Sequence, residues 1–338
     1  MGIRIQTGSS TYTELTGTKG IFVQTGASTY DRAEAVYLQT GANTYVLVHQ
    51  FDITNPVVPT PTVTPNSGTQ DTVYWGAITD AGSGVASATV YQLYYGTTSG
   101  FVAGTATNLS SFGANTIGTT FAIPTNRRNT PTGENWIVTY YIVATDAAGN
   151  SLQGTAAANH YTKPLGDYSF VPTGADARNI GNTAWLNQTT ADEGMVGFST
   201  TKLYGAWFYG STAFSNKTLG WKPDSGTIWL QRAGATQTNR GNSGTFSIRA
   251  HTSPTKVSGT NGALSYVTST ITSSISGNDG TGLPALSNDQ LNGLQADTVK
   301  GFALTGHSTT VAFLRGLTVS TNNNPYSVYS GTVFLTYT

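Results

Sequence analysis

The chain has no cysteine, and charged residues make up only 9% of its 338 positions. Without cysteine it can form neither disulfides nor thiolate metal sites. Lysine plus arginine and aspartate plus glutamate both number 16, so the formal net charge is zero and no basic stripe is available to bind nucleic acid. No run of about 18 apolar residues occurs, so we expect no membrane span. The first residues also lack the regions of a signal peptide, which predicts synthesis in a cytoplasm.

Polarity comes instead from threonine, serine, asparagine and 40 glycines, and aromatic residues reach 11%, with 18 tyrosines. Threonine and tyrosine favour strands, whereas glycine and asparagine favour tight turns. Long stretches of good helix formers at helical period are missing, so we predict an all-β protein. Few charges also leave open sheet edges poorly protected against pairing, which favours a protein whose edges are covered in an assembly.

A ten-residue segment occurs three times near the N-terminus, at Ile3–Tyr12, Ile21–Tyr30 and Val36–Tyr45. Each copy has an apolar strand, a Gln-Thr-Gly turn and a Thr-Tyr return strand, which predicts a small β-hairpin. Such a hairpin cannot bury an apolar face alone, so the copies should stack or meet copies from other subunits. We predict that the module anchors a homotrimer through the glutamine and tyrosine of each copy: Gln6, Tyr12, Gln24, Tyr30, Gln39 and Tyr45.

The chain beyond the repeats divides at a proline-rich spacer. The repeats occupy residues 1–54, and four prolines lie within residues 55–65, which predicts a stiff, extended segment. Residues 66–163 contain short strands separated by glycine and asparagine turns, and this pattern predicts a two-sheet sandwich with Trp136 and Tyr141 in its core.

The C-terminal part, residues 164–338, alternates strand candidates with turns and has one predicted helical turn at 288–294. We predict a jelly-roll-type sandwich for it. Exposed aromatic rings there would stack on the C–H faces of sugars, and the candidates for glycan binding are Trp221, Trp207 and Tyr209. Alternation places Trp207 and Tyr209 on one face of a strand, where packing in the core is the competing interpretation, whereas Trp221 lies in a turn-rich segment.

The middle segment has two recognisable turns, Asp80–Gly84 and the end of Tyr140–Asn150. On these residues it resembles the immunoglobulin-like and fibronectin-type-III-like modules of bacterial and phage surface proteins. Asp80, Asp146 and Asn150 would offer oxygen ligands for Ca²⁺ at one pole of such a sandwich. The same residue types also close turns without any ion.

The sequence offers little for catalysis. The carboxylates of Asp192 and Glu193 are adjacent and would face opposite ways on a strand, whereas a glycosidase needs a facing pair. The four histidines are isolated, which argues against a histidine metal site and favours positions at a surface or interface. No Gly-x-Ser-x-Gly motif with a following acid and histidine is present. We therefore predict that the protein is not an enzyme and has no cofactor.

The whole chain resembles the minor tail proteins of siphophages that infect actinobacteria. The resemblance rests on the Gln-Thr-Gly repeats and on four later segments in the same order: Trp207–Gly210, Ser225–Arg232, Leu291–Leu304 and Asn324–Tyr326. It implies a non-enzymatic virion protein at the tail tip or on a fibre, in contact with other tail proteins and with host envelope glycan. A capsid decoration protein is the alternative, and a glycan-cleaving tail enzyme is the third hypothesis.

Overall fold

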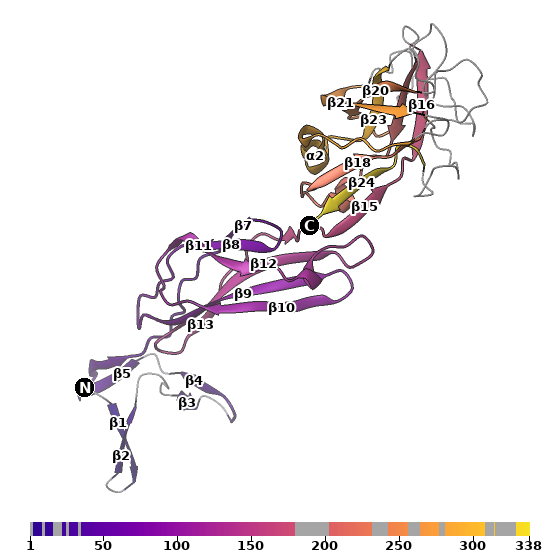
Figure 1. The fold of residues 1–338 in the computed structure, drawn as a ribbon. Coiled ribbons are helices and arrows are strands. Elements are labelled where there is room, and N and C mark those ends of the chain that lie inside the picture. The colour runs from indigo at the N-terminus through magenta and orange to yellow at the C-terminus, as the bar shows by residue number, and fades with distance from the viewer. Residues whose placement is uncertain are drawn as a thin grey trace. The chain divides into compact units, whose positions relative to one another are not determined.

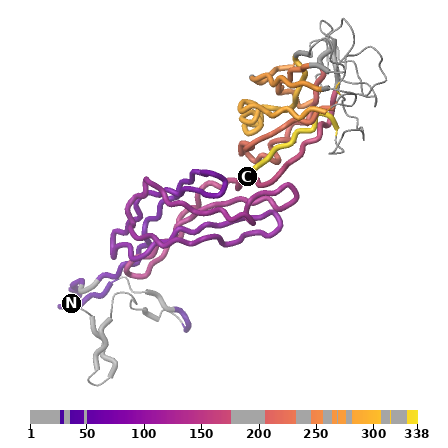
Figure 2. The backbone as a smooth tube through the Cα atoms, viewed as in Figure 1, coloured from indigo at the N-terminus to yellow at the C-terminus, as the bar shows by residue number. Residues whose placement is uncertain are grey.

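The computed structural model describes residues 3–8, 11–15, 22–24, 27–32, 35–179, 203–231, 243–255, 264–276, 281–307, 314 and 329–338. Antiparallel strands dominate these residues, with two short α-helices, which confirms the predicted all-β class (Figure 1). The chain forms two compact units, the first made of residues 1–127 and 134–162 and the second of residues 128–133 and 163–338. Figure 2 traces the Cα backbone in the same view.

The three repeats form three separate hairpins, each paired only with itself among the described strands. Their strands are β1 (Ile3–Gly8) with β2 (Thr11–Leu15), β3 (Phe22–Gln24) with β4 (Tyr30–Arg32), and β5 (Ala35–Gly41) with β6 (Thr44–Gln50). In every hairpin the glutamine of the repeat lies opposite its tyrosine: Gln6 opposite Tyr12, Gln24 opposite Tyr30, and Gln39 opposite Tyr45. The repeated sequence therefore sets the same strand register three times.

The rest of the first unit is a sandwich of two antiparallel sheets. One sheet has the order β11 (Asn115–Ala122), β8 (Gln70–Trp75), β7 (Thr62–Pro65). The other has the order β10 (Gly100–Asn108), β9 (Val85–Gly96), β12 (Trp136–Asp146), β13 (Ser151–Gln153), and β14 (His160–Tyr161) also pairs with β12. A 3₁₀ turn, η1, spans Thr125–Arg127.

Burial alternates along the central strand β12, as expected of a strand with one face on the core. Trp136 lies in this core, as predicted from its place in an apolar strand. The expectation for Tyr141 is wrong, because Tyr140 points into the core whereas Tyr141 lies on the outer face and stacks on Tyr91. Trp136 and Tyr141 are an odd number of residues apart, so a strand must place them on opposite faces.

A buried polar contact joins the two sheets. The Tyr140 hydroxyl on β12 donates to the Asp71 carboxylate on β8 over 2.8 Å and accepts from Gln92 Nε2 on β9 over 2.9 Å. His160 Nε2 lies 3.1 Å from the same carboxylate, out of hydrogen-bonding alignment. This contact links the two sheets directionally, beside the apolar core that they share.

Replacing Tyr140 with phenylalanine is expected to destabilise the sandwich by about 2 kcal/mol, because the buried Asp71 carboxylate loses its hydroxyl donor. Tyr141→Phe, on the outer face, should change the free energy of unfolding by less than about 0.5 kcal/mol. Urea unfolding of both variants measures the difference. A loss for Tyr140→Phe as small as that expected for Tyr141→Phe would show that the contact between the sheets contributes no net stability.

The second unit also has two main antiparallel sheets. A three-stranded sheet has the order β15 (Gly166–Phe170), β24 (Val333–Tyr337), β18 (Ser225–Ile228), with β24 between its two neighbours in Figure 1. A five-stranded sheet has the order β16 (Gly174–Asn179), β17 (Leu203–Phe208), β23 (Gly301–His307), β20 (Ser243–His251), β21 (Tyr266–Ser276). The pair β19 (Leu230–Gln231) and β22 (Thr281–Gly282) and the helices α1 (Ser215–Thr218) and α2 (Asn288–Gln295) complete the unit.

Side chains from both sheets of the second unit meet in one apolar core, to which β17, β23, β24 and α2 all contribute. Helix α2 begins with a capping box in which Ser287 and Gln290 bond each other's backbone N–H. Neither helix in the described part of the chain approaches the length and apolarity that a membrane crossing requires.

Candidate cation site and the predicted binding residues

Three carboxylates gather at one end of the sandwich. Asp52 follows β6, Asp80 lies in the turn before β9, and Asp146 is the last residue of β12. Their carboxylate oxygens lie within 4.8 Å of one another. The structure therefore brings the predicted residues Asp80 and Asp146 together and adds Asp52, which the sequence analysis missed.

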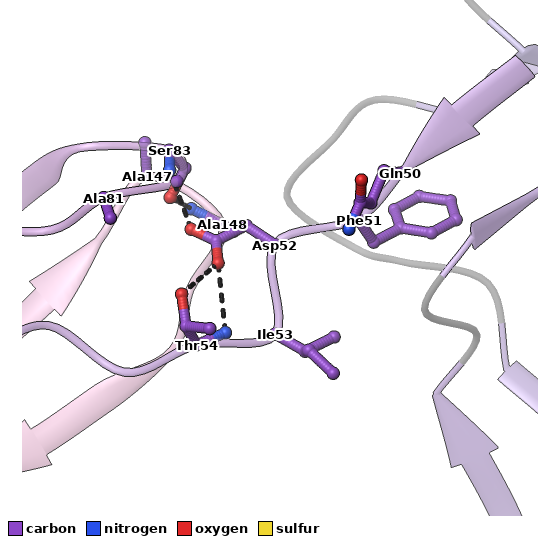
Figure 3. A pocket seen from close by; sticks show the side chains of 10 residues that line it. Gln50, Phe51, Asp52, Ile53, Thr54, Ala81, Ser83, Ala147 and Ala148 are labelled. Carbon is purple, nitrogen blue, oxygen red and sulfur yellow. Dashed lines mark hydrogen bonds between the residues drawn. The ribbon is translucent and has the colours of Figure 1, made fainter. Parts of the chain in front are cut away.

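Hydrogen bonds hold the Asp52 carboxylate in this position (Figure 3). One oxygen accepts from the hydroxyl and the backbone N–H of Thr54 over 2.6 and 3.0 Å, and the other accepts from Ser83 N over 2.7 Å. These hydrogen bonds lower the pKa of Asp52 well below its usual value, and the bond from the Thr54 hydroxyl has the largest effect. A side chain at Gly82 would overlap the carboxylate, so the close approach requires glycine there.

The other two carboxylates are held by their own turns. Asp80 Oδ2 accepts from the backbone N–H groups of Gly82 and Gly84 over 3.1 and 2.8 Å. Asp146 is 2% exposed, and its two oxygens accept from the backbone N–H and the side-chain Nδ2 of Asn150 over 2.7 and 2.6 Å. All three carboxylates are thus fixed by loops before any ligand is considered.

Asn150 has a different role from the one predicted. Its Nδ2 donates to Asp146 and also to the carbonyl oxygen of Asp52 over 3.0 Å, so the amide connects two of the acidic residues. The nitrogen rather than the oxygen of this amide faces them. The predicted calcium ligands are therefore better described as Asp52, Asp80 and Asp146.

The donor set suits a hard cation. Carboxylate oxygens are the ligands that Ca²⁺ prefers, and loops give the adaptable geometry that it accepts. Among the described residues no lysine, arginine or histidine forms an ion pair with these three aspartates. A cavity of about 640 Å³ lies beside Asp52, lined by residues 50–54, 81–83 and 147–148. These residues could hold Ca²⁺, with the open side completed by solvent.

Calcium is expected to raise the thermal unfolding midpoint of the first unit. At a free concentration ten times its Kd, a ligand of the folded state adds about 1.4 kcal/mol. Calorimetry with calcium and with a chelator measures the shift. Asp80→Asn should abolish it, whereas Asp167→Asn, an exposed carboxylate of the second unit, should leave it intact. A shift of equal size in the Asp80 variant would place calcium elsewhere.

The structure contradicts the glycan-binding prediction for Trp207 and Tyr209. Trp207 is fully buried and Tyr209 nearly so, and both belong to the core of the second unit. Phe208 is buried on the opposite face of β17, where it clusters with Leu264 and Ala303. Trp221 is half-buried and packs against the same core, which leaves only part of its ring to solvent.

Only the third repeat has described side chains at the predicted oligomerisation positions. Tyr45 is 61% exposed, and Gln39 is exposed with its Nε2 donating to Gly41 O over 3.1 Å. The side chains of Gln6, Tyr12, Gln24 and Tyr30 lie outside the described residues, as do Asp192, Glu193 and Asn324–Tyr326.

The position of His251 differs from the expected one at a surface or interface. It is fully buried, and its Nε2 lies 3.2 Å from the carbonyl oxygen of Trp207. A carbonyl only accepts, so Nε2 carries the proton and Nδ1 does not. The pKa of His251 is lowered to about 4, and burial is the main cause.

Comparison with protein-family models and with curated proteins finds no match to this chain.

Proposed function

We propose that the protein is a structural component of a phage virion, a minor tail protein at the tail tip or fibre that takes part in host attachment. The observation that supports it most is the hairpin β5–β6. Its strands pair only with each other among the described residues, and they expose Tyr37, Leu38, Tyr45, Val46 and Leu47 to solvent. An isolated two-stranded hairpin is at best marginally stable in water.

A partner that covers the hairpin would bury these exposed apolar side chains. The exposed apolar side chains lie on both faces of the hairpin, with Tyr37 and Leu47 on one face and Leu38 and Val46 on the other, and apolar surface of this kind marks protein–protein contact. The three hairpins share one register, so three copies of the chain around an axis would present three equivalent sets of edges to one another. Such a module anchors the chain in an assembly and leaves the sandwich of the first unit and the whole second unit for other contacts.

The location is tested on purified particles of the phage that encodes the chain. Antibodies against the purified protein, detected by gold labelling in electron microscopy, are expected to mark one end of the tail. Label distributed over the capsid would favour the decoration protein instead. Particles without label or peptide from this chain would overturn a virion role.

The full-length protein is expected to have three times the 35.4 kDa mass of one chain in light scattering. The double variant Leu38→Ser, Leu47→Ser removes two exposed apolar side chains of the third hairpin and should shift the mass toward that of the monomer. Thermal unfolding of the sandwich and of the second unit should not change. Ile117→Ser is the matched control, since Ile117 is 91% exposed on β11 of the sandwich. A monomeric wild-type protein, or equal dissociation in the control, would contradict the role of the hairpins.

A further inference from the structure

A second aromatic surface lies on the outer face of the sandwich, where the sequence analysis placed no site. Strand register sets Phe101, Tyr95, Ile137 and Tyr161 side by side in one row across β10, β9, β12 and β14. Phe101 is 73% exposed, and Tyr95 and Tyr161 are also exposed. Residues directly opposite each other in antiparallel strands point to the same face, so this row is one continuous surface.

The rings on this face are mutually ordered. The ring centroids of Tyr95 and Phe101 lie 5.0 Å apart. Further along the same two central strands, Tyr91 and Tyr141 stack with centroids 5.2 Å apart and an interplanar angle of 12°. Contacts between rings on a rigid sheet restrict their rotamers, so little side-chain entropy remains to be lost when a ligand covers them.

A pocket of about 290 Å³ opens at the row. Its walls are Leu93, Tyr94, Tyr95, Phe101, Ile137, Thr139 and Asn159. The volume lies just below the range usual for drug-sized ligands, which leaves room for about one sugar ring. The pocket thus combines apolar walls with a small number of neutral polar groups.

Two of those polar groups can fix the orientation of a ligand. The Thr139 hydroxyl donates to Ala157 O over 2.8 Å, so its oxygen is left as an acceptor toward the pocket. Asn159 is exposed and offers both a donor and an acceptor. Sugar hydroxyls need both kinds of partner.

The face carries almost no charge. The strands β9, β10, β12, β13 and β14 contain one charged residue, Asp146, which is buried, and one histidine, His160, which faces Asp71 on the inner side. A phosphate, an acidic peptide or a basic peptide would therefore find no ion-pair partner in these strands. Aromatic rings with neutral hydrogen-bonding groups match the C–H faces and hydroxyls of an uncharged sugar.

We propose that this outer face binds neutral saccharide, with one pyranose ring in the pocket against Phe101 and Tyr95 and neighbouring units along the aromatic row. A role of this site in contacting a host envelope depends on the attachment role proposed above. The binding of saccharide itself does not depend on that role and is argued from the pocket alone. It replaces the binding surface that the sequence analysis expected in the second unit.

The test uses the full-length protein with four tetrasaccharides, of glucose, galactose, mannose and N-acetylglucosamine, and with a heparin tetrasaccharide as the charged comparison. Saturation-transfer NMR and calorimetric titration are expected to detect millimolar binding of at least one neutral tetrasaccharide. Phe101→Ala should weaken that binding at least fivefold, as the loss of one aromatic contact implies. Tyr95→Ser tests the second ring, and Ile117→Ala is the control for an exposed apolar side chain on the other sheet.

Several results would overturn the proposal. They are no binding of any neutral tetrasaccharide, binding unchanged in both ring variants, or stronger binding of heparin. Self-association that disappears in Phe101→Ala would show that a second copy of the chain covers this face instead. Particle labelling is independent of this measurement, so a failed attachment role and a failed saccharide site can be told apart.

Discussion

Replacing Trp207 with alanine is expected to destabilise the second unit by about 3–5 kcal/mol, the usual loss for a large aromatic side chain deleted from a core. Trp207 is fully buried and packs in the cluster that joins both sheets. Its Nε1 has no hydrogen-bond partner in the described part of the chain, so the loss comes from burial and the cavity left behind. A Cβ at Gly331 would overlap the indole, so glycine there allows the close approach, and it has no side chain to fill the cavity.

Trp221→Ala is the matched control, because Trp221 is half-buried at the border of the same core. Its loss is expected to be about 1 kcal/mol, in proportion to the smaller apolar area that it buries. Hydrogen exchange at β17 and β23 in the full-length variants measures the second unit separately from the sandwich. Equal and small losses would mean that the indole of Trp207 is not central to the core.

Lowering the pH from 6.5 to 4 is expected to remove about 3 kcal/mol of stability from the second unit through His251. In the folded state the pKa of His251 is lowered to about 4, chiefly by burial, whereas an unfolded chain has the ordinary value of 6.5. Between these values the unfolded state binds the proton and the folded state does not. Stability is therefore fully present above pH 6.5, falls as the pH decreases, and levels off below 4.

His251→Gln separates this effect from the titration of carboxylates, which both proteins share. The variant keeps a donor for the Trp207 carbonyl but cannot take up a proton in this range. Its stability, measured by hydrogen exchange at β20 and β23, should depend less on pH than that of the wild type. Parallel pH profiles would show that His251 does not titrate between the two states.

The local pattern of the sequence predicted several elements correctly. The Gln-Thr-Gly repeats gave three hairpins, because turn residues and strand residues a few positions apart settle both the turn and the register. The predicted helical turn at 288–294 is α2, whose start is fixed by the adjacent capping residues Ser287 and Gln290. The apolar run Trp136–Ala144 identified β12 as a strand.

The local pattern of the sequence could not predict which other elements pack against each strand. Period-two alternation shows that Trp207 and Phe208 face opposite ways, but not that β17 has a strand on each side and side chains packed on both faces. The outer aromatic row depends on four strands pairing in register, and its members Phe101 and Tyr161 are far apart in the chain.

The sequence by itself determined the all-β class, the register of the hairpins, the absence of cysteine and the low content of charged residues, since each depends on composition or on neighbours a few residues apart. Only the tertiary structure decided which side chains meet. Asp52 joins Asp80 and Asp146 because three loops from distant parts of the chain converge, with a hydrogen bond from Ser83 to Asp52 spanning 31 positions. Burial follows from the packing of whole sheets. It placed Trp207 and Tyr209 in the core of the second unit and left Phe101 and Tyr95 exposed on the sandwich, because a ring is exposed only where no second layer covers its strand.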